Sequence, residues 1–92
     1  MSEELFELGL VCGTPAALAA LEQAGQDPAG LLARHVRGDA GSLCEDDRVA
    51  NRLSLEQGGR ILSAYVLAGG TKVWVITEWD RSLTTVLLPS DY

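Results

Sequence analysis

The last third of the chain constrains the fold most, because residues 60–92 have the pattern of three β-strands joined by two short turns. Strands are predicted at 60–67, 71–78 and 83–88, where β-branched, aromatic and leucine side chains dominate. Gly69 and Gly70 fit a two-residue turn, since few other residues tolerate the positive φ that such a hairpin requires. Both faces of this sheet would carry large apolar side chains, so each face needs a cover.

The pairing of these strands predicts one aromatic and aliphatic patch. A two-residue turn places Tyr65 opposite Trp74, and the second hairpin places Leu87 opposite Trp74 and Thr85 opposite Ile76. A slip of one residue would move a whole strand's side chains to the other face. The predicted binding residues on this patch are Tyr65, Trp74, Ile76 and Leu87.

Three short helices are predicted ahead of the strands. Thr14-Pro15 and Asp27-Pro28 each combine an N-cap residue with proline at the first helical position, and these helices should end near Gly25 and Gly38. Ser42 and Glu45 have the spacing of a capping box for a third helix. The buried stripe of that helix is predicted to be Val49, Ala50 and Leu53.

These elements predict a single α+β domain over residues 1–92. Three short N-terminal helices should pack on one face of a three-stranded antiparallel β-meander, because helices and strands occupy separate halves of the sequence. The short apolar run Leu10-Val11-Cys12 leaves open whether a further edge strand precedes the first helix. Only one sheet face would then be covered by the chain itself.

The composition excludes some classes of partner. The formal net charge is −6, from 13 acidic and 7 basic residues, which disfavours direct binding to phosphate backbones and favours a basic protein partner. No apolar run approaches the ~20 residues that cross a bilayer. The acidic start Met1-Ser2-Glu3-Glu4 lacks the basic region of a signal peptide. We therefore expect a cytoplasmic protein with no membrane association.

No cofactor is predicted, since the chain contains neither of the glycine-rich motifs that cradle phosphates. The two cysteines, Cys12 and Cys44, lack the close spacing of a metal site and are expected to be half-buried free thiols. Glu45, Asp46 and Asp47 are adjacent at a helix start, where side chains diverge and do not converge on a metal.

His35 is the only histidine, and it shares a predicted helix face with Leu31 and Leu32. That position favours a buried histidine with satisfied hydrogen bonds and no catalytic role. The alternative is a metal-independent RNase similar to barnase-type and colicin-type toxins, in which arginines hold a phosphate. Its catalytic residues would be His35, Arg60, Arg81, Thr84 and Thr85, although β-propensity alone also explains the threonines.

Three segments carry a family resemblance: Arg34-His35-Val36-Arg37-Gly38-Asp39, the run from Arg60 to Tyr65, and the run from Trp74 to Pro89. They resemble small uncharacterised proteins that are often called plasmid-related proteins, some of which carry a type I restriction subunit label. The family pattern continues His-Val-x-Gly-Asp with Trp-Gly, and Ala40 stands here in place of that tryptophan. The resemblance covers the chain from about Phe6 onward and implies a mobile genetic element, with a role in its maintenance or in host defence. It implies no activity and no catalytic residue.

Together these observations predict a small acidic binding protein of a mobile element. We expect it to act through protein–protein interaction, with a partner or with a second copy, using the patch of Tyr65, Trp74, Ile76 and Leu87. The family context also allows an inhibitor of a defence complex that imitates the charge of nucleic acid.

Overall fold

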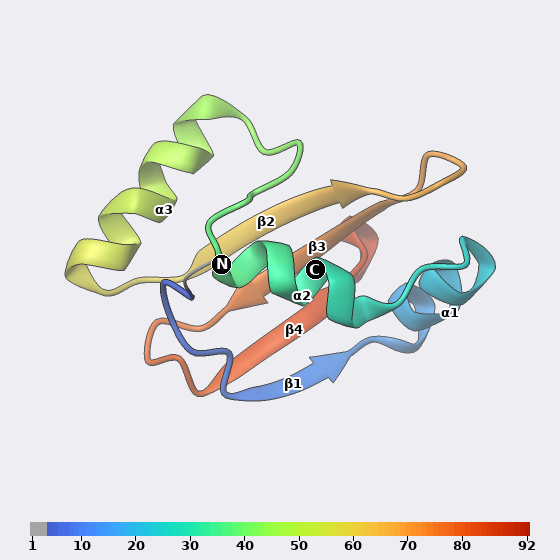
Figure 1. The fold of residues 1–92 in the computed structure, drawn as a ribbon, viewed down its shortest axis with the longest axis horizontal. Helices are drawn as coiled ribbons and strands as arrows, with labels where there is room; N and C mark the ends of the chain where they lie inside the picture. Colours follow the sequence, from blue (N-terminus) through green and yellow to red (C-terminus); the bar gives the residue numbers. More distant parts are fainter. Residues whose placement is uncertain (1–3) are drawn as a thin grey trace.

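A computed structural model describes residues 4–92 of the chain; the acidic start at 1–3, on which the signal-peptide prediction depends, lies outside them. Three helices and a four-stranded sheet make up the domain, and a short 3₁₀ turn follows the last strand (Figure 1). In chain order the elements are β1 (Leu10–Gly13), α1 (Pro15–Gln23), α2 (Pro28–Val36), α3 (Glu45–Gln57), β2 (Ile61–Val66), β3 (Lys72–Thr77), β4 (Leu83–Leu87) and η1 (Pro89–Asp91).

The prediction of a three-stranded antiparallel meander is wrong. The strand order of the sheet is β1-β4-β3-β2, and β1 pairs with β4 in parallel, so the sheet is mixed. The parallel pair joins segments separated by all three helices and two strands, and no local sequence pattern reports such a contact. Strand β1 satisfies the edge of β4 that a three-stranded sheet would leave unpaired.

The first hairpin is shifted by one residue from the predicted register. Tyr65 pairs with Val73 and Ala64 with Trp74, because the loop has three residues, Ala68 to Gly70, instead of two. Both glycines of this loop have positive φ, as a tight turn requires. The second hairpin has the predicted register, with Trp74 opposite Leu87.

The two sheet faces are covered unequally. Helices α1 and α2 lie across one face, which we call the covered face, and Figure 1 shows α2 running in front of the strands. Its buried core includes Leu21, Leu31, Val73, Val75 and Val86. The opposite face has no helix lying across it, and we call it the open face. Its sheet residues are Leu62, Ala64, Val66, Lys72, Trp74, Ile76, Leu83, Thr85 and Leu87.

Helix α3 does not join α1 and α2 on the covered face, contrary to the prediction. It lies beside the edge of β2 and buries none of its side chains (Figure 1). Asn51 accepts a hydrogen bond from the Leu62 amide at 3.0 Å and donates to the Leu62 carbonyl at 2.6 Å. One side chain thus replaces a strand partner at the edge of the sheet.

The start of α3 also differs from the predicted capping box. Cys44 is the N-cap residue, and the Ser42 hydroxyl instead donates to the Ala64 carbonyl at 3.3 Å. The loop before α3 runs so close to β2 that a Cβ on Gly41 would lie 2.1 Å from the Ala64 carbonyl oxygen. Beyond the contact with Asn51, this loop provides the next hydrogen-bonding partner for the edge of β2.

Residues of the motif from Arg34 to Asp39 contact Tyr65 and so tie the end of α2 to β2. The Arg34 guanidinium binds the Asp39 carboxylate at 2.8 Å and lies 4.6 Å from the centre of the Tyr65 ring. The Tyr65 hydroxyl donates to the Asp39 carbonyl at 2.6 Å. Ala40 follows with 4% exposure and packs near Ala64, so the motif has a structural role here.

Candidate functional site

The shifted hairpin divides the predicted binding patch. Tyr65 lies in the core of the covered face with 1% of its surface exposed, so its assignment to the patch is wrong. The open face brings together Trp74, Ile76 and Leu87, as expected from the predicted register of the second hairpin. Leu62 and Ala64 take the place that the prediction gave to Tyr65 and Ser63, because β2 presents the alternate set of side chains.

A groove of about 320 Å³ runs between α3 and the open face. Trp74 and Ile76 form its sheet side, and Ala50 of α3 forms the opposite wall. Tyr92 folds back over the sheet, where its ring makes an edge-on contact with Trp74 at 5.8 Å between centroids. The remaining lining residues are Asp47, Asn51, Arg60 and Leu62. The sequence did not indicate Leu62, because of the register shift, Ala50, because its role depends on where α3 docks, or Tyr92, because it folds back onto Trp74.

The apolar surface continues beyond the groove onto α3. Val49, Ala50 and Leu53 were predicted to be the buried stripe, but they point to solvent; Val49 is 40% exposed and Leu53 is 50% exposed. Their spacing of three and four residues puts them side by side on the helix surface. The open face adds Val66, which is 53% exposed. These exposed side chains lack a partner within the described part of the chain, whereas Ile76 and Leu87 of the open face are buried.

Acidic groups lie beside this surface, and few acidic side chains of the described residues form ion pairs. Two ion pairs form within residues 4–92, Arg34 with Asp39 and Arg52 with Glu45. Asp46 and Glu56, on the outer side of α3 near Leu53, take part in neither. The groove itself has Asp47 on one wall and Arg60 on the other, whose guanidinium lies 5.7 Å from the centre of the Tyr92 ring. Three acidic groups on α3, Asp46, Asp47 and Glu56, thus lie beside the apolar stripe, while Arg60 and Lys72 are the basic groups of the open face.

His35 lies on the other side of the sheet, at the centre of a buried chain of hydroxyl groups. Its Nδ1 lies 2.6 Å from the Ser63 Oγ and its Nε2 lies 2.9 Å from the Thr77 Oγ1. Thr77 in turn contacts the Thr84 hydroxyl at 2.7 Å, and Thr84 donates to the Leu8 carbonyl at 2.7 Å. The ring is fully buried, which confirms the prediction of a buried histidine with satisfied hydrogen bonds.

The carbonyl at the end of this series of hydrogen bonds determines which atom is the donor in each of them. The Leu8 carbonyl can only accept, so Thr84 donates to it and accepts from Thr77, which leaves Thr77 to accept from His35. His35 therefore carries its proton on Nε2 and accepts from Ser63 at Nδ1. Burial lowers the pKa of His35 from 6.5 to about 4, so the ring is neutral at physiological pH.

The residues of the alternative RNase site are not brought together. Thr84 joins the His35 chain through Thr77, but Thr85 points to the open face. Arg60 stacks on Tyr92, also on the open face. Arg81 donates to backbone carbonyls, among them Ser54 at the end of α3 and Glu78 in the turn, and so holds α3 to the second hairpin. No phosphate could contact His35 and both arginines at once.

Neither a metal site nor a membrane span is formed by the described residues. Within residues 4–92, no three or more His, Cys, Asp and Glu side chains are placed so that they could hold a metal ion together. The helices of the same region are too short and too polar to cross a bilayer. Cys12 and Cys44 are free thiols, and both are exposed, not half-buried as predicted.

Comparison with known proteins gives no match: no protein-family model, no curated protein and no solved structure is similar to this chain. The resemblance to plasmid-related proteins therefore stays a prediction.

Proposed function

We propose that this protein is a binding module that docks an apolar segment of a protein partner on its open face. One observation carries the proposal: helices cover one face of the sheet, while the groove on the other face opens beside Trp74, and Tyr92 and Leu53 next to it expose half or more of their surface. Trp74 and Tyr92 lie beside the groove, and such residues dominate the energetics of protein interfaces. Apolar surface of this kind commonly marks an interaction site.

The charge favours a basic partner over a second copy of the chain. Each chain carries a net charge of −6, so two copies repel one another. Asp46, Asp47 and Glu56 border the apolar stripe of α3, and they would attract lysines or arginines that flank an apolar segment. The partner proposed here is thus an apolar segment with basic residues on its flanks.

The biological setting of the proposal comes from the resemblance to plasmid-related proteins. Under it the protein belongs to a mobile genetic element and serves the maintenance of that element or its defence against the host, and the proposed cytoplasmic location comes separately from the sequence. A protein-binding module fits either role, because both depend on capture of a host or plasmid-encoded protein. No observation of the site favours a second function.

Selection from a displayed library of random peptides tests the proposal with a matched pair of variants. The peptides recovered by the wild-type protein should carry apolar residues flanked by Lys or Arg. Trp74→Glu should abolish their binding, because it puts a charge in the groove. Trp79→Glu makes the same change at a 67% exposed turn residue off the open face, and it should leave binding intact. Equal loss in both variants, or peptides without basic flanks, would contradict the proposal.

A further inference from the structure

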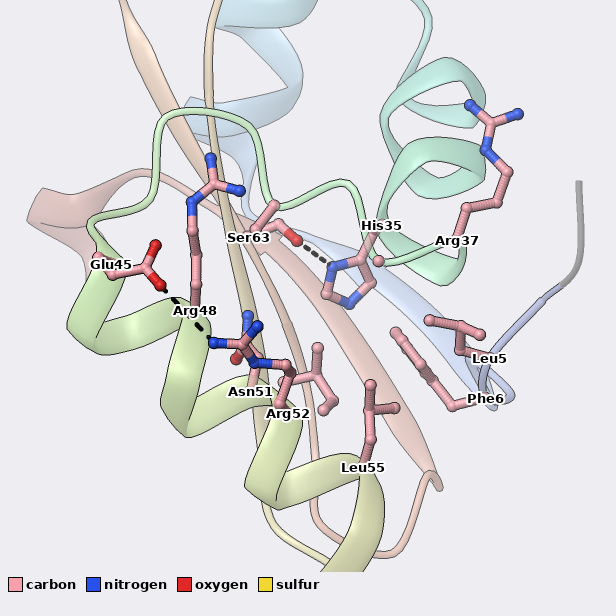
Figure 2. Close-up of a pocket in the computed structure, with 13 residues that line it drawn as sticks. Leu5, Phe6, His35, Arg37, Glu45, Arg48, Asn51, Arg52, Leu55 and Ser63 are labelled. Atoms are coloured by element: carbon pink, nitrogen blue, oxygen red, sulfur yellow. Dashed lines mark hydrogen bonds and ion pairs between the residues drawn. The ribbon is translucent and has the colours of Figure 1, made fainter.

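A second pocket, on the covered-face side of α3, follows from the position of that helix. Because Asn51 holds α3 at the edge of β2, a gap is left between α2 and α3 above Ile61 and Ser63. A pocket of about 330 Å³ opens there between α2, α3 and β2 (Figure 2). At about 30 Å³ for each water-sized group, it has room for roughly ten such groups.

The inner part of this pocket is apolar. Phe6, Leu55 and Ile61 line it, and Figure 2 shows Leu55 beside Arg52 on α3, with Phe6 facing them from the N-terminal segment. His35 lies behind Phe6, with the two rings edge to face at 5.1 Å. Since His35 is fully buried and both its nitrogens are hydrogen-bonded, the ring forms part of the floor and offers no polar contact.

The rim of the pocket is cationic, although the chain as a whole is acidic. Arg48 and Arg52 are one helical turn apart on α3, and both line the pocket with a single carboxylate, Glu45. Arg52 binds Glu45 at 3.6 Å, a contact in which both side chains are more than two-thirds exposed. Arg48 donates to the Gly41 and Leu43 carbonyls, which are uncharged and leave its positive charge uncompensated.

We propose that this pocket binds a small amphiphilic carboxylate, with its carboxylate at Arg52 and its apolar body against Phe6, Leu55 and Ile61, while Arg48, held against the loop carbonyls, adds positive charge to the rim. The carboxylate of Glu45 already occupies the Arg52 position, so the geometry suits that group. An exposed ion pair of this length contributes little, and a ligand carboxylate can displace it. Apolar walls with few polar groups at one end are the usual composition of a small-molecule site.

Octanoate is a suitable probe, because its straight chain fits the apolar part and its head carries one negative charge at pH 7. Titration of octanoate into the wild-type protein, followed by amide NMR, should shift the signals of Phe6, Leu55 and Ile61. Acetate lacks the tail and 1-octanol lacks the charge, so each should bind at least tenfold more weakly. Neither comparison requires a variant to fold.

Three variants test which charged side chains octanoate binding depends on. Arg52→Met should weaken octanoate binding roughly tenfold, since a charge-assisted contact is lost while the apolar stem is kept. Lys72→Met removes the same charge from the open face and should leave the affinity unchanged. Glu45→Gln removes the competing carboxylate and should strengthen binding about threefold.

Several results would overturn the proposal. One is the absence of octanoate-dependent shifts at millimolar concentration in a folded protein. Equal binding of 1-octanol, or equal effects of Arg52→Met and Lys72→Met, would show that no anion site exists. Shifts centred on Leu62 and Trp74 would place the fatty chain in the groove of the open face instead.

Discussion

At the scale of the residue, His35 links the stability of this domain to a buried chain of hydrogen bonds. Its ring joins α2 to β2 and β3 through Ser63 and Thr77, with no solvent access. The neutral Nε2–H form satisfies every member of the hydroxyl chain, whereas a protonated ring would lack an acceptor at Nδ1 unless Ser63 reoriented. Burial alone lowers the pKa, so the same residue couples folding to pH.

Lowering the pH from about 6.5 to about 4 should reduce the free energy of unfolding through His35. The unfolded chain takes up this proton near pH 6.5, while the folded ring resists it down to about pH 4. The stability is therefore fully present above pH 6.5 and is lost as the pH falls, by about 3 kcal/mol in total. Denaturant unfolding at a series of pH values measures this slope.

His35→Gln tests the assignment of that slope. The variant should cost about 1–2 kcal/mol at pH 7, because hydrogen bonds of the buried chain are lost, and it should remove most of the loss between pH 6.5 and 4. The carboxylates with lowered pKa values, Asp39, Asp80 and Asp91, titrate below this window. A slope that His35→Gln leaves unchanged would contradict the account of His35.

At the scale of elements, the sequence predicted the helices α1 and α2 and three strands because their signals are local. Thr14 and Asp27 cap the helices as expected, with the Thr14 hydroxyl accepting from the Ala17 amide and Asp27 accepting from the Ala29 amide. Gly69 and Gly70 predict a two-residue turn, but Ala68 belongs to the loop as well, and this single residue exchanges the faces to which the β2 side chains point. Turn length is set by strand pairing, which the residues between the strands do not determine alone.

Long-range pairing and polar docking explain the other errors. The parallel contact of β1 with β4 has no local signal. Helix α3 was expected to bury Val49, Ala50 and Leu53, yet it docks through Asn51 and exposes that stripe. The sequence around Asn51 has no signal for this contact, since only the free edge of β2 gives the residue its role. The groove and the pocket both follow from this docking, so neither could be predicted.

Replacing Asn51 should therefore release α3 from the sheet. Asn51→Ala leaves the amide and carbonyl of Leu62 without partners and should cost about 1–3 kcal/mol. Hydrogen exchange of the Leu62 amide should become faster, together with exchange in α3. Asn51→Asp keeps the acceptor for the Leu62 amide and loses the donor, so it should give an intermediate effect. Unchanged Leu62 exchange in Asn51→Ala would show that the loop and Arg81 hold α3 without it.

At the scale of the whole molecule, the acidic charge should speed association with a basic partner. Glu56→Lys reverses a charge on α3 beside the apolar stripe, without a known partner interaction to disturb. It should slow the association of a selected basic peptide and flatten its dependence on salt, with little change in melting temperature. Glu22→Lys, on α1, makes the same change away from the open face and should have a smaller effect. Stopped-flow rates at several ionic strengths compare the two, and identical rates would mean that the charge serves solubility alone.

Asp91 is unsuitable for that test, although its position near the end of the chain suggests otherwise. Its carboxylate accepts from the Thr14 hydroxyl at 2.6 Å and from the Leu88 amide at 3.0 Å. These contacts hold η1 in place, and with it the Tyr92 ring over Trp74. Substitution of Asp91 would change the shape of the groove as well as its charge.

The most direct test of the open face as a binding surface is an amide NMR map of the protein with a selected peptide. The account predicts that the shifts centre on Leu62, Trp74 and Ile76 in the sheet and on Ala50 and Leu53 in α3. Light scattering of the protein alone should give the mass of a monomer. Shifts centred on α1 and α2 would contradict the assignment of the surface, and a dimer that Trp74→Glu dissociates would show that the face binds a second copy instead of a basic partner.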